Sequence, residues 1–159
     1  MVRKIEMQPV HRRDMMKIVG VGAIAGIVAG MLPGLAHADA AAAAAAVKKA
    51  AGGKEPASGK ITLELPQIAE NGNTVPIGFD IESPMTDSSY VKTVHVFADN
   101  NPNPEVGVFH FTPACGRAKA STRMRMAKTQ NVIAVAEMND GSVYMAKSEV
   151  KVTIGGCGG

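Results

Sequence analysis

The sequence lacks tryptophan, and it has only two tyrosines and four phenylalanines among its 159 residues. Its 17 basic and 14 acidic residues give an excess of positive charge, but this excess lies at one end of the chain. Residues 1–38 contain five basic and two acidic residues, so 12 of each remain from Asp39 onward. A nucleic-acid-binding domain is expected to have a basic surface and aromatic side chains on which bases stack. Because residues 39–159 are neutral overall and have no tryptophan, we exclude nucleic acid as a partner.

The sequence also lacks the motifs of common catalytic and cofactor sites. It has no glycine-rich phosphate loop, no Ser-His-Asp arrangement and no carboxylate pair. His95 and His110 lie within expected strands, without cysteine or carboxylate at the spacing of metal ligands, so we interpret both as structural or surface residues. Met124 and Met126 have the period-two spacing of core residues, which we favour over a soft-metal site. We therefore expect no cofactor and no metal.

Residues 1–38 have the layout of an export signal. A charged stretch precedes an apolar stretch over residues 18–35, and a small-x-small sequence, Ala-His-Ala, ends at Ala38. We expect cleavage between Ala38 and Asp39, which would leave the mature protein without a membrane segment. An uncleaved anchor is the alternative, because about 19 apolar residues just span a bilayer.

The charged stretch contains a sequence that resembles the twin-arginine motif. Arg12 and Arg13 are followed, after one residue, by two large apolar residues, Met15 and Met16, and by Lys17. The twin-arginine system exports proteins that are already folded, usually with a cofactor or together with a partner that has no signal of its own. Since we expect no cofactor, we expect a periplasmic protein that is exported with a partner.

Residues 39–59 are expected to form a short, marginal helix followed by a loose linker. Residues 40–46 are seven consecutive alanines, and alanine is the best helix former. Gly52 and Gly53 are a plausible end for this helix. From residue 60 the pattern changes to a period of two.

Residues 60–154 are predicted to form one all-β domain, an immunoglobulin-like antiparallel β-sandwich. The segment 132–135 is apolar on both faces, as a central strand would be, and we consider it a candidate for contact with a partner. Asn139-Asp140-Gly141 predicts a hairpin. The tryptophan and the paired cysteines of an antibody core are missing. About eight short strands are expected, over residues 61–65, 75–82, 94–98, 106–111, 122–126, 132–135, 142–146 and 150–154.

A local cluster of basic residues lies along and beyond one expected strand. It consists of Arg117, Lys119, Arg123, Arg125 and Lys128. Two interpretations stay open: a solvated face of the sheet, or a surface that attracts an anionic or acidic partner.

The chain ends with Gly155-Gly156-Cys157-Gly158-Gly159. Glycine has no side chain to pack and the largest backbone entropy, so we expect residues 155–159 to form a flexible arm. The thiol of Cys157 would reach about 10 Å from the domain. Such an arm is suited to presenting one covalent cargo to several active sites. A tail without function and a disulfide to Cys115 are the alternatives, although exposed thiols of exported proteins oxidise readily.

The sequence over residues 150–159, together with the twin-arginine signal, resembles SoxY, the sulfur-carrier subunit of the periplasmic thiosulfate-oxidising Sox system. The likeness extends to residues 100–105 and 129–132. It implies that Cys157 holds thiosulfate-derived groups as the covalently bound substrate, and that the protein is a carrier rather than an enzyme. Cys115 has no counterpart in the functional motif of the family.

The resemblance also implies the partners. SoxZ would form a stable heterodimer with the chain. The cytochrome complex SoxAX would couple thiosulfate to the cysteine, SoxB would release sulfate, and the sulfane dehydrogenase SoxCD, where present, would oxidise the remaining sulfur.

Two other functions are alternatives to the carrier. Ubiquitin-like sulfur carriers also end in Gly-Gly, but they work in the cytoplasm with ATP, which the export signal contradicts. A periplasmic assembly or adhesion domain, crosslinked through Cys157, is the second alternative.

Overall fold

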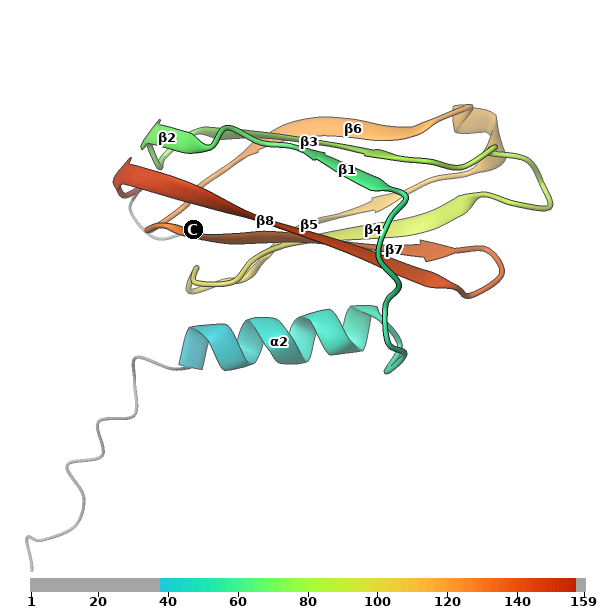
Figure 1. Cartoon of the computed structure of the whole chain (residues 1–159), viewed down its shortest axis with the longest axis horizontal. Helices are drawn as coiled ribbons and strands as arrows, with labels where there is room; N and C mark the ends of the chain where they lie inside the picture. The colour runs from blue at the N-terminus through green and yellow to red at the C-terminus, as the bar shows by residue number, and fades with distance from the viewer. Residues whose placement is uncertain (1–37, 157–159) are drawn as a thin grey trace, which may run out of the picture. The chain divides into compact units, whose positions relative to one another are not determined.

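The computed structural model describes residues 38–156. The expected export signal, with Arg12 and Arg13, lies outside the described residues, as do Cys157, Gly158 and Gly159. No helix in the described part is long and apolar enough to cross a membrane. The elements, in chain order (Figure 1), are α2 (Ala38–Ala50), β1 (Ile61–Glu64), β2 (Ile68–Asn71), β3 (Val75–Ile81), β4 (Val91–Ala98), β5 (Glu105–His110), the 3-10 helix η1 (Pro113–Cys115), β6 (Ala118–Met124), β7 (Gln130–Met138) and β8 (Val143–Ile154).

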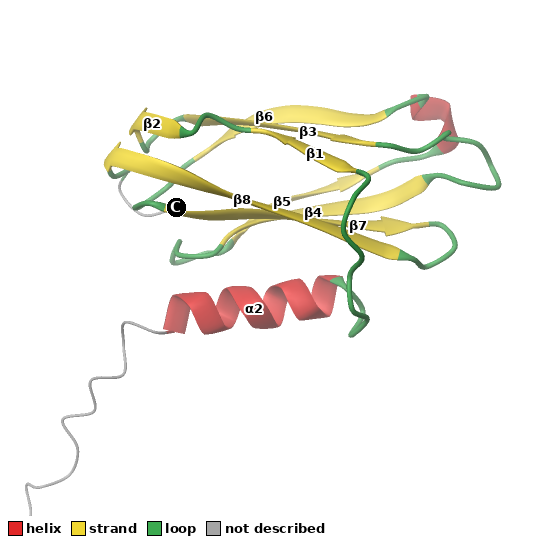
Figure 2. Ribbon diagram, in the orientation of Figure 1, coloured by secondary structure: helices red, strands yellow, loops and turns green. Residues whose placement is uncertain are grey.

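The strands form two sheets that pack face to face (Figure 2). One sheet has the order β1-β3-β6, and the other has the order β2-β8-β7-β4-β5. Neighbouring strands are antiparallel, except that β2 runs parallel to β8. The prediction of an all-β sandwich is confirmed, and the finer immunoglobulin-like class stays a prediction.

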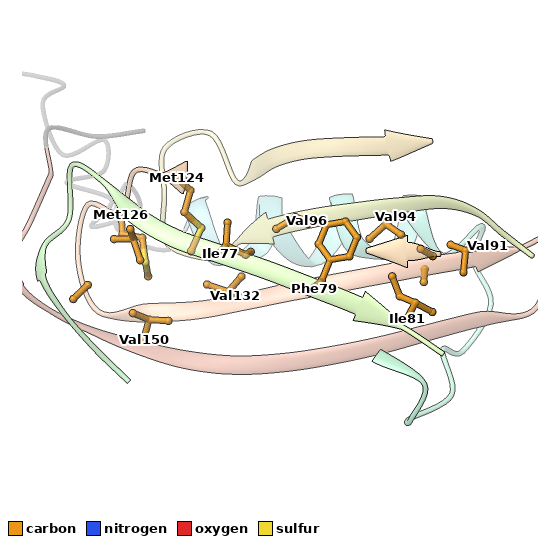
Figure 3. Close-up of a cluster of buried hydrophobic side chains, with 14 of the residues drawn as sticks. Ile77, Phe79, Ile81, Val91, Val94, Val96, Met124, Met126, Val132 and Val150 are labelled. Atoms are coloured by element: carbon orange, nitrogen blue, oxygen red, sulfur yellow. The ribbon is translucent and has the colours of Figure 1, made fainter. Parts of the chain in front are cut away.

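The core between the sheets is built by buried apolar side chains from both sheets (Figure 3). In β3 the inward side chains include Ile77 and Phe79, which are 2% and 1% exposed. The ring of Phe79 meets that of Phe109 edge to face, with 5.0 Å between their centroids. Met124 and Met126 are also buried, which confirms their assignment to the core. Burial of this kind contributes about 25 cal/mol per Å² of apolar surface removed from water.

A second, smaller cluster lies on the other face of the five-stranded sheet, beneath α2. Ala46, Val47 and Ala50 of the helix pack against side chains that include Phe97 and Ile133. The two-faced burial of residues 132–135 is thereby explained, because one face meets the core and the other meets the helix. The expectation that this segment contributes to a partner contact is wrong, since α2 already covers its outer face.

The helix ends as predicted, but the segment that follows it is not a loose linker. Gly52 and Gly53 have positive φ angles of 60° and 75°, which glycine adopts without strain. Ala57 then pairs with β8: its N–H donates to the carbonyl of Val143, and its carbonyl accepts from the N–H of Met145, both at 2.9 Å. These bonds satisfy part of the free edge of β8.

Two strand predictions need correction. Residues 142–146 and 150–154 were expected to be separate strands, but β8 is continuous because Lys147, Ser148 and Glu149 pair with β7 despite being polar. Strand β2 was not predicted. Of its four residues only Ala69 is buried, so no alternation marks it in the sequence. The predicted hairpin at Asn139-Asp140-Gly141 is confirmed between β7 and β8.

Candidate functional site: the root of the C-terminal arm

Gly155 and Gly156 leave the end of β8 and lie against two other segments of the sandwich. The first is the turn between β2 and β3, and the second is the connection between β6 and β7. Three backbone hydrogen bonds join these segments. Gly72 N–H donates to the carbonyl of Ile154 at 2.8 Å, Met126 N–H donates to the carbonyl of Gly72 at 2.7 Å, and Gly156 N–H donates to the carbonyl of Met126 at 2.9 Å. We call these bonds the arm clasp.

The clasp needs glycine because the backbones approach too closely for a side chain. A Cβ atom on Gly155 would lie 2.2 Å from the carbonyl oxygen of Ala127. A Cβ atom on Gly156 would lie 2.7 Å from the carbonyl oxygen of Gly72, and one on Gly72 would lie 2.3 Å from that of Met126. These neighbours are backbone atoms, which cannot rotate away as a side chain would. Close backbone approach is therefore one reason for glycine at all three positions.

The expectation of a free arm is wrong for its first two residues. Gly156 is buried and hydrogen-bonded, and the backbone of Gly155 is held against Ala127. A glycine that lacks a Cβ atom can be mobile, but it can also pack backbone against backbone, and here it does the latter. The remaining arm residues, Cys157, Gly158 and Gly159, lie outside the described residues. Adjacent Cα atoms are about 3.8 Å apart, so the Cα atom of Cys157 can be no farther than this from that of Gly156, which is anchored.

Two buried amide side chains hold the connection that carries Met126. Asn101 is 3% exposed, and its Nδ2 donates to the carbonyl of Arg125 at 2.8 Å. Its Oδ1 accepts from the N–H of Ala127 at 3.1 Å and from Nε2 of Gln130 at 2.8 Å. Gln130, which is 2% exposed, also donates to the carbonyl of Lys128. Buried polar groups satisfied in this way fix a loop in one conformation.

These supporting residues come from the two internal segments that carried the resemblance in the sequence. Asn101 belongs to residues 100–105, and Gln130 belongs to residues 129–132. Thr129, from the second segment, accepts the N–H of Val152 in β8 at 2.9 Å. Sequence reasoning did not foresee that both segments converge at the root of the arm. The polar residues of these segments were the available signal, but their pairing depends on the fold.

Cys115 lies in η1, at the end of β6 remote from the clasp (Figure 2). Strand β6 separates the two places, and its length, at about 3.3 Å per residue, is about 20 Å. A disulfide requires Cα atoms within about 7 Å of each other. While Gly156 is bonded to Met126, an internal disulfide between Cys115 and Cys157 is therefore excluded.

Cys115 is an exposed free thiol. Two hydrogen bonds from Thr112 lower the pKa of this thiol, because they favour the thiolate. The bond from the backbone of Thr112 contributes more than the bond from its hydroxyl. The Thr112 hydroxyl lies 3.8 Å from Sγ of Cys115.

The two histidines of the sandwich do not form a site with one another. His95 is half-buried, its ring stacks on that of Phe97, and its Nδ1 has no hydrogen-bond partner. His110 is exposed, with Nδ1 3.3 Å from the hydroxyl of Thr93. In the part of the chain that the structure describes, no three His, Cys, Asp or Glu residues are placed to hold a metal ion.

The two-sheet architecture recurs in solved structures of superoxide reductases. A superoxide reductase (neelaredoxin) from Ignicoccus hospitalis matches with a TM-score of 0.53 and 16% identity, over 58% of this chain and 79% of its own. A putative superoxide reductase from Thermotoga maritima matches with a TM-score of 0.50 and 19% identity, over 62% of this chain and 87% of its own. At these identities the likeness defines the class of fold, a β-sandwich, and nothing more.

A further comparison identifies the family. The sulfur carrier protein SoxY from Chlorobium limicola f thiosulfatophilum is 34% identical, with a TM-score of 0.59, over 72% of this chain and 99% of its own. The family model of sulfur oxidation protein SoxY matches residues 47–157. No curated protein matches this chain. The chain belongs to the SoxY family, whose members are sulfur carriers rather than enzymes.

Proposed function

We propose that the chain holds sulfur intermediates of thiosulfate oxidation covalently on Cys157 and presents them to successive enzymes. Membership of the SoxY family supports the carrier role, and the family match extends to residue 157 itself. The arm clasp supports the choice of this cysteine, because it holds the preceding residue at one end of the sandwich.

The proposed loading step joins the Cys157 thiolate to the outer sulfur of thiosulfate. A new S–S bond forms, giving a cysteine S-thiosulfonate, and two electrons pass to the c-type cytochrome complex SoxAX. SoxB would then add water to the terminal sulfonate, which leaves as sulfate with two protons, and a persulfide would remain on Cys157. Where SoxCD is present, this dehydrogenase would oxidise the persulfide sulfur in place to a sulfonate, with three water molecules supplying the oxygens and SoxCD accepting six electrons and passing them on. A second hydrolysis would then release sulfate and restore the thiol.

The chain contributes delivery to these steps rather than activation. A free cysteine titrates near pH 8.5, so only a few per cent is thiolate at neutral pH. We infer that the pockets of the enzymes supply the charge or the base that raises this fraction.

We propose a periplasmic location, reached by the twin-arginine route through Arg12 and Arg13. Cleavage between Ala38 and Asp39 would fall at the first residues of α2 and so would keep the helical residues that pack on the sheet.

The proposed stable partner is SoxZ, exported together with this chain. Its contact would use a surface other than residues 132–135, which α2 covers. The exposed large apolar side chains of the described part are Ile68, Val108 and Ile154.

The experiment that tests the proposal is thiosulfate-dependent turnover with purified SoxZ, SoxAX and SoxB. The Cys157→Ser variant should form the heterodimer and unfold like the wild type, yet support no turnover. Cys115→Ser is the matched control, and it should retain most of the activity. Turnover by Cys157→Ser would overturn the proposal. A C-terminal cysteine found only in disulfide-linked dimers would instead support the assembly-domain alternative.

A further inference from the structure

The basic residues of β6 and the connection after it fall into two groups. Near the start of β6, Arg117 pairs with Asp80 at 2.7 Å. Lys119 pairs with Glu64 at 2.7 Å and lies 3.9 Å from Asp80. The charges of this first group are therefore compensated by carboxylates on the same sheet.

The second group consists of Arg123, Arg125 and Lys128, which we call the arm-side basic surface. All three are exposed, and none of them forms an ion pair within residues 38–156. The strand register gives the reason. Lys119 lies opposite Asp80 of β3, whereas Arg123 lies opposite Pro76, which has no charge to offer.

Two carboxylates line grooves together with members of this second group. Glu105 of β5 lines a shallow groove of about 240 Å³ together with Arg123 and Arg125. Glu105 forms no ion pair with Arg123 or Arg125. Glu64 lines a second groove with Arg123, but it is already paired with Lys119. The surface therefore keeps a net positive charge.

Arg125 and Lys128 of the arm-side basic surface flank, in the sequence, the two residues that contact the root of the arm. Met126, which accepts the hydrogen bond from Gly156, lies between Arg125 and Lys128 in the sequence. The carbonyl of Arg125 is itself bonded to Asn101, so the backbone here is fixed. Because Cys157 follows Gly156 directly, a protein that receives its thiol in a pocket must approach this end of the sandwich closely.

We propose that Arg123, Arg125 and Lys128 dock against acidic protein surfaces around the pockets that receive the arm. The inference rests on the proposed function of Cys157. An extended protein surface fits better than a small anion, because the three side chains are exposed along a strand and a loop and the groove beside Arg123 and Arg125 is shallow. Charge complementarity of this kind raises association rates and makes them depend on salt.

The test compares two sets of neutralised variants in the reconstituted reaction with SoxZ, SoxAX and SoxB. One set is Arg123→Gln, Arg125→Gln and Lys128→Gln combined. The matched control is Arg117→Gln with Lys119→Gln, which removes cations from the same strand but from the compensated group. Turnover is measured against carrier concentration at ionic strengths of about 0.01 M and about 1 M, where the Debye length is about 30 Å and about 3 Å.

At low ionic strength we expect the triple variant to lower kcat/KM by about tenfold, with kcat little changed and the difference vanishing at high salt. The control should change kcat/KM by less than about twofold, since exposed ion pairs contribute little. A triple variant with the kcat/KM and salt dependence of the wild type would overturn the inference. Loss of the SoxZ heterodimer in that variant would also overturn it, by assigning the surface to the subunit contact.

These outcomes are separate from a failure of the proposed function. If the wild-type chain supports no turnover, or if Cys157→Ser supports it fully, the carrier assignment fails whatever the basic surface does. If Cys157→Ser is inactive and the triple variant behaves as the wild type, only the docking inference fails.

Discussion

Replacing Gly156 with alanine tests whether the root of the arm is anchored. The new Cβ atom would lie 2.7 Å from the carbonyl oxygen of Gly72, 2.8 Å from its carbonyl carbon and 3.0 Å from the nitrogen of Asn73. Ordinary van der Waals contacts of a Cβ atom begin at 3.4 Å. All three neighbours are backbone atoms of one tight turn, so the overlap is relieved by moving the arm rather than the turn.

The cost is limited by what the arm gains from docking. Undocking breaks the hydrogen bond from Gly156 to Met126, and one such bond contributes about 0.5–1.5 kcal/mol. We therefore expect Gly156→Ala to lower the free energy of unfolding by about 1 kcal/mol, and the melting temperature by about 4 °C. Gly107→Ala is the matched control, because its Cβ atom would meet nothing closer than 3.7 Å, on the ring of Phe109. That variant should be as stable as the wild type or more stable by up to about 1 kcal/mol.

Denaturant unfolding measures the global effect, and amide hydrogen exchange at residue 156 measures the local one. The Gly156 amide should be protected in the wild type, and Gly156→Ala should lose this protection while the amides of β7 keep theirs. An unprotected Gly156 amide in the wild type, together with unchanged stability of Gly156→Ala, would refute the anchored root.

Further predictions concern export, the second thiol and the helix. Replacing both Arg12 and Arg13 with lysine should leave the precursor in the cytoplasm. Periplasmic wild-type protein should begin at Asp39 on N-terminal sequencing, and periplasmic protein that begins at Met1 would contradict cleavage. In protein without the carrier thiol, alkylation of Cys115 should titrate at slightly lower pH than in the Thr112→Val variant. That variant keeps the backbone hydrogen bond of residue 112, which lowers the pKa of this thiol most, and removes only the hydroxyl, so identical profiles would contradict the contribution of the hydroxyl. Phe97→Ala should lower the free energy of unfolding, measured by chemical denaturation, by about 3 kcal/mol, because Phe97 is 1% exposed beneath α2. A loss below about 1 kcal/mol would show that the helix does not pack there.

The sandwich was predictable because one-sided burial leaves a period of two in the sequence. Residues 75–81 show this pattern, and they form β3 with its apolar side chains inward. Strand β2 was not predictable, because it is held by backbone pairing with β8 rather than by a buried face. The continuity of β8 was missed for a related reason, since Lys147, Ser148 and Glu149 are polar and still pair with β7.

The packing at the root of the arm could not be predicted from the sequence, and the carrier chemistry of the arm stays a prediction. The single cysteine among glycines indicates such an arm in the sequence. Whether those glycines are free or packed depends on a contact with Gly72, which is remote in the chain and belongs to a turn that the sequence did not single out. The sequence places the basic residues in one cluster, and the register of β6 against β3 divides this cluster into a compensated and an uncompensated group.

Peptide mass measurement after loading is the most direct test of the carrier function. The wild-type chain, in complex with SoxZ, is incubated with thiosulfate and oxidised SoxAX, then digested and analysed without reducing agent. The account predicts a mass increase of one thiosulfate group on the C-terminal peptide that contains Cys157, lost on addition of SoxB except for one sulfur atom. An increase on the peptide that contains Cys115, or none on either peptide, would contradict it.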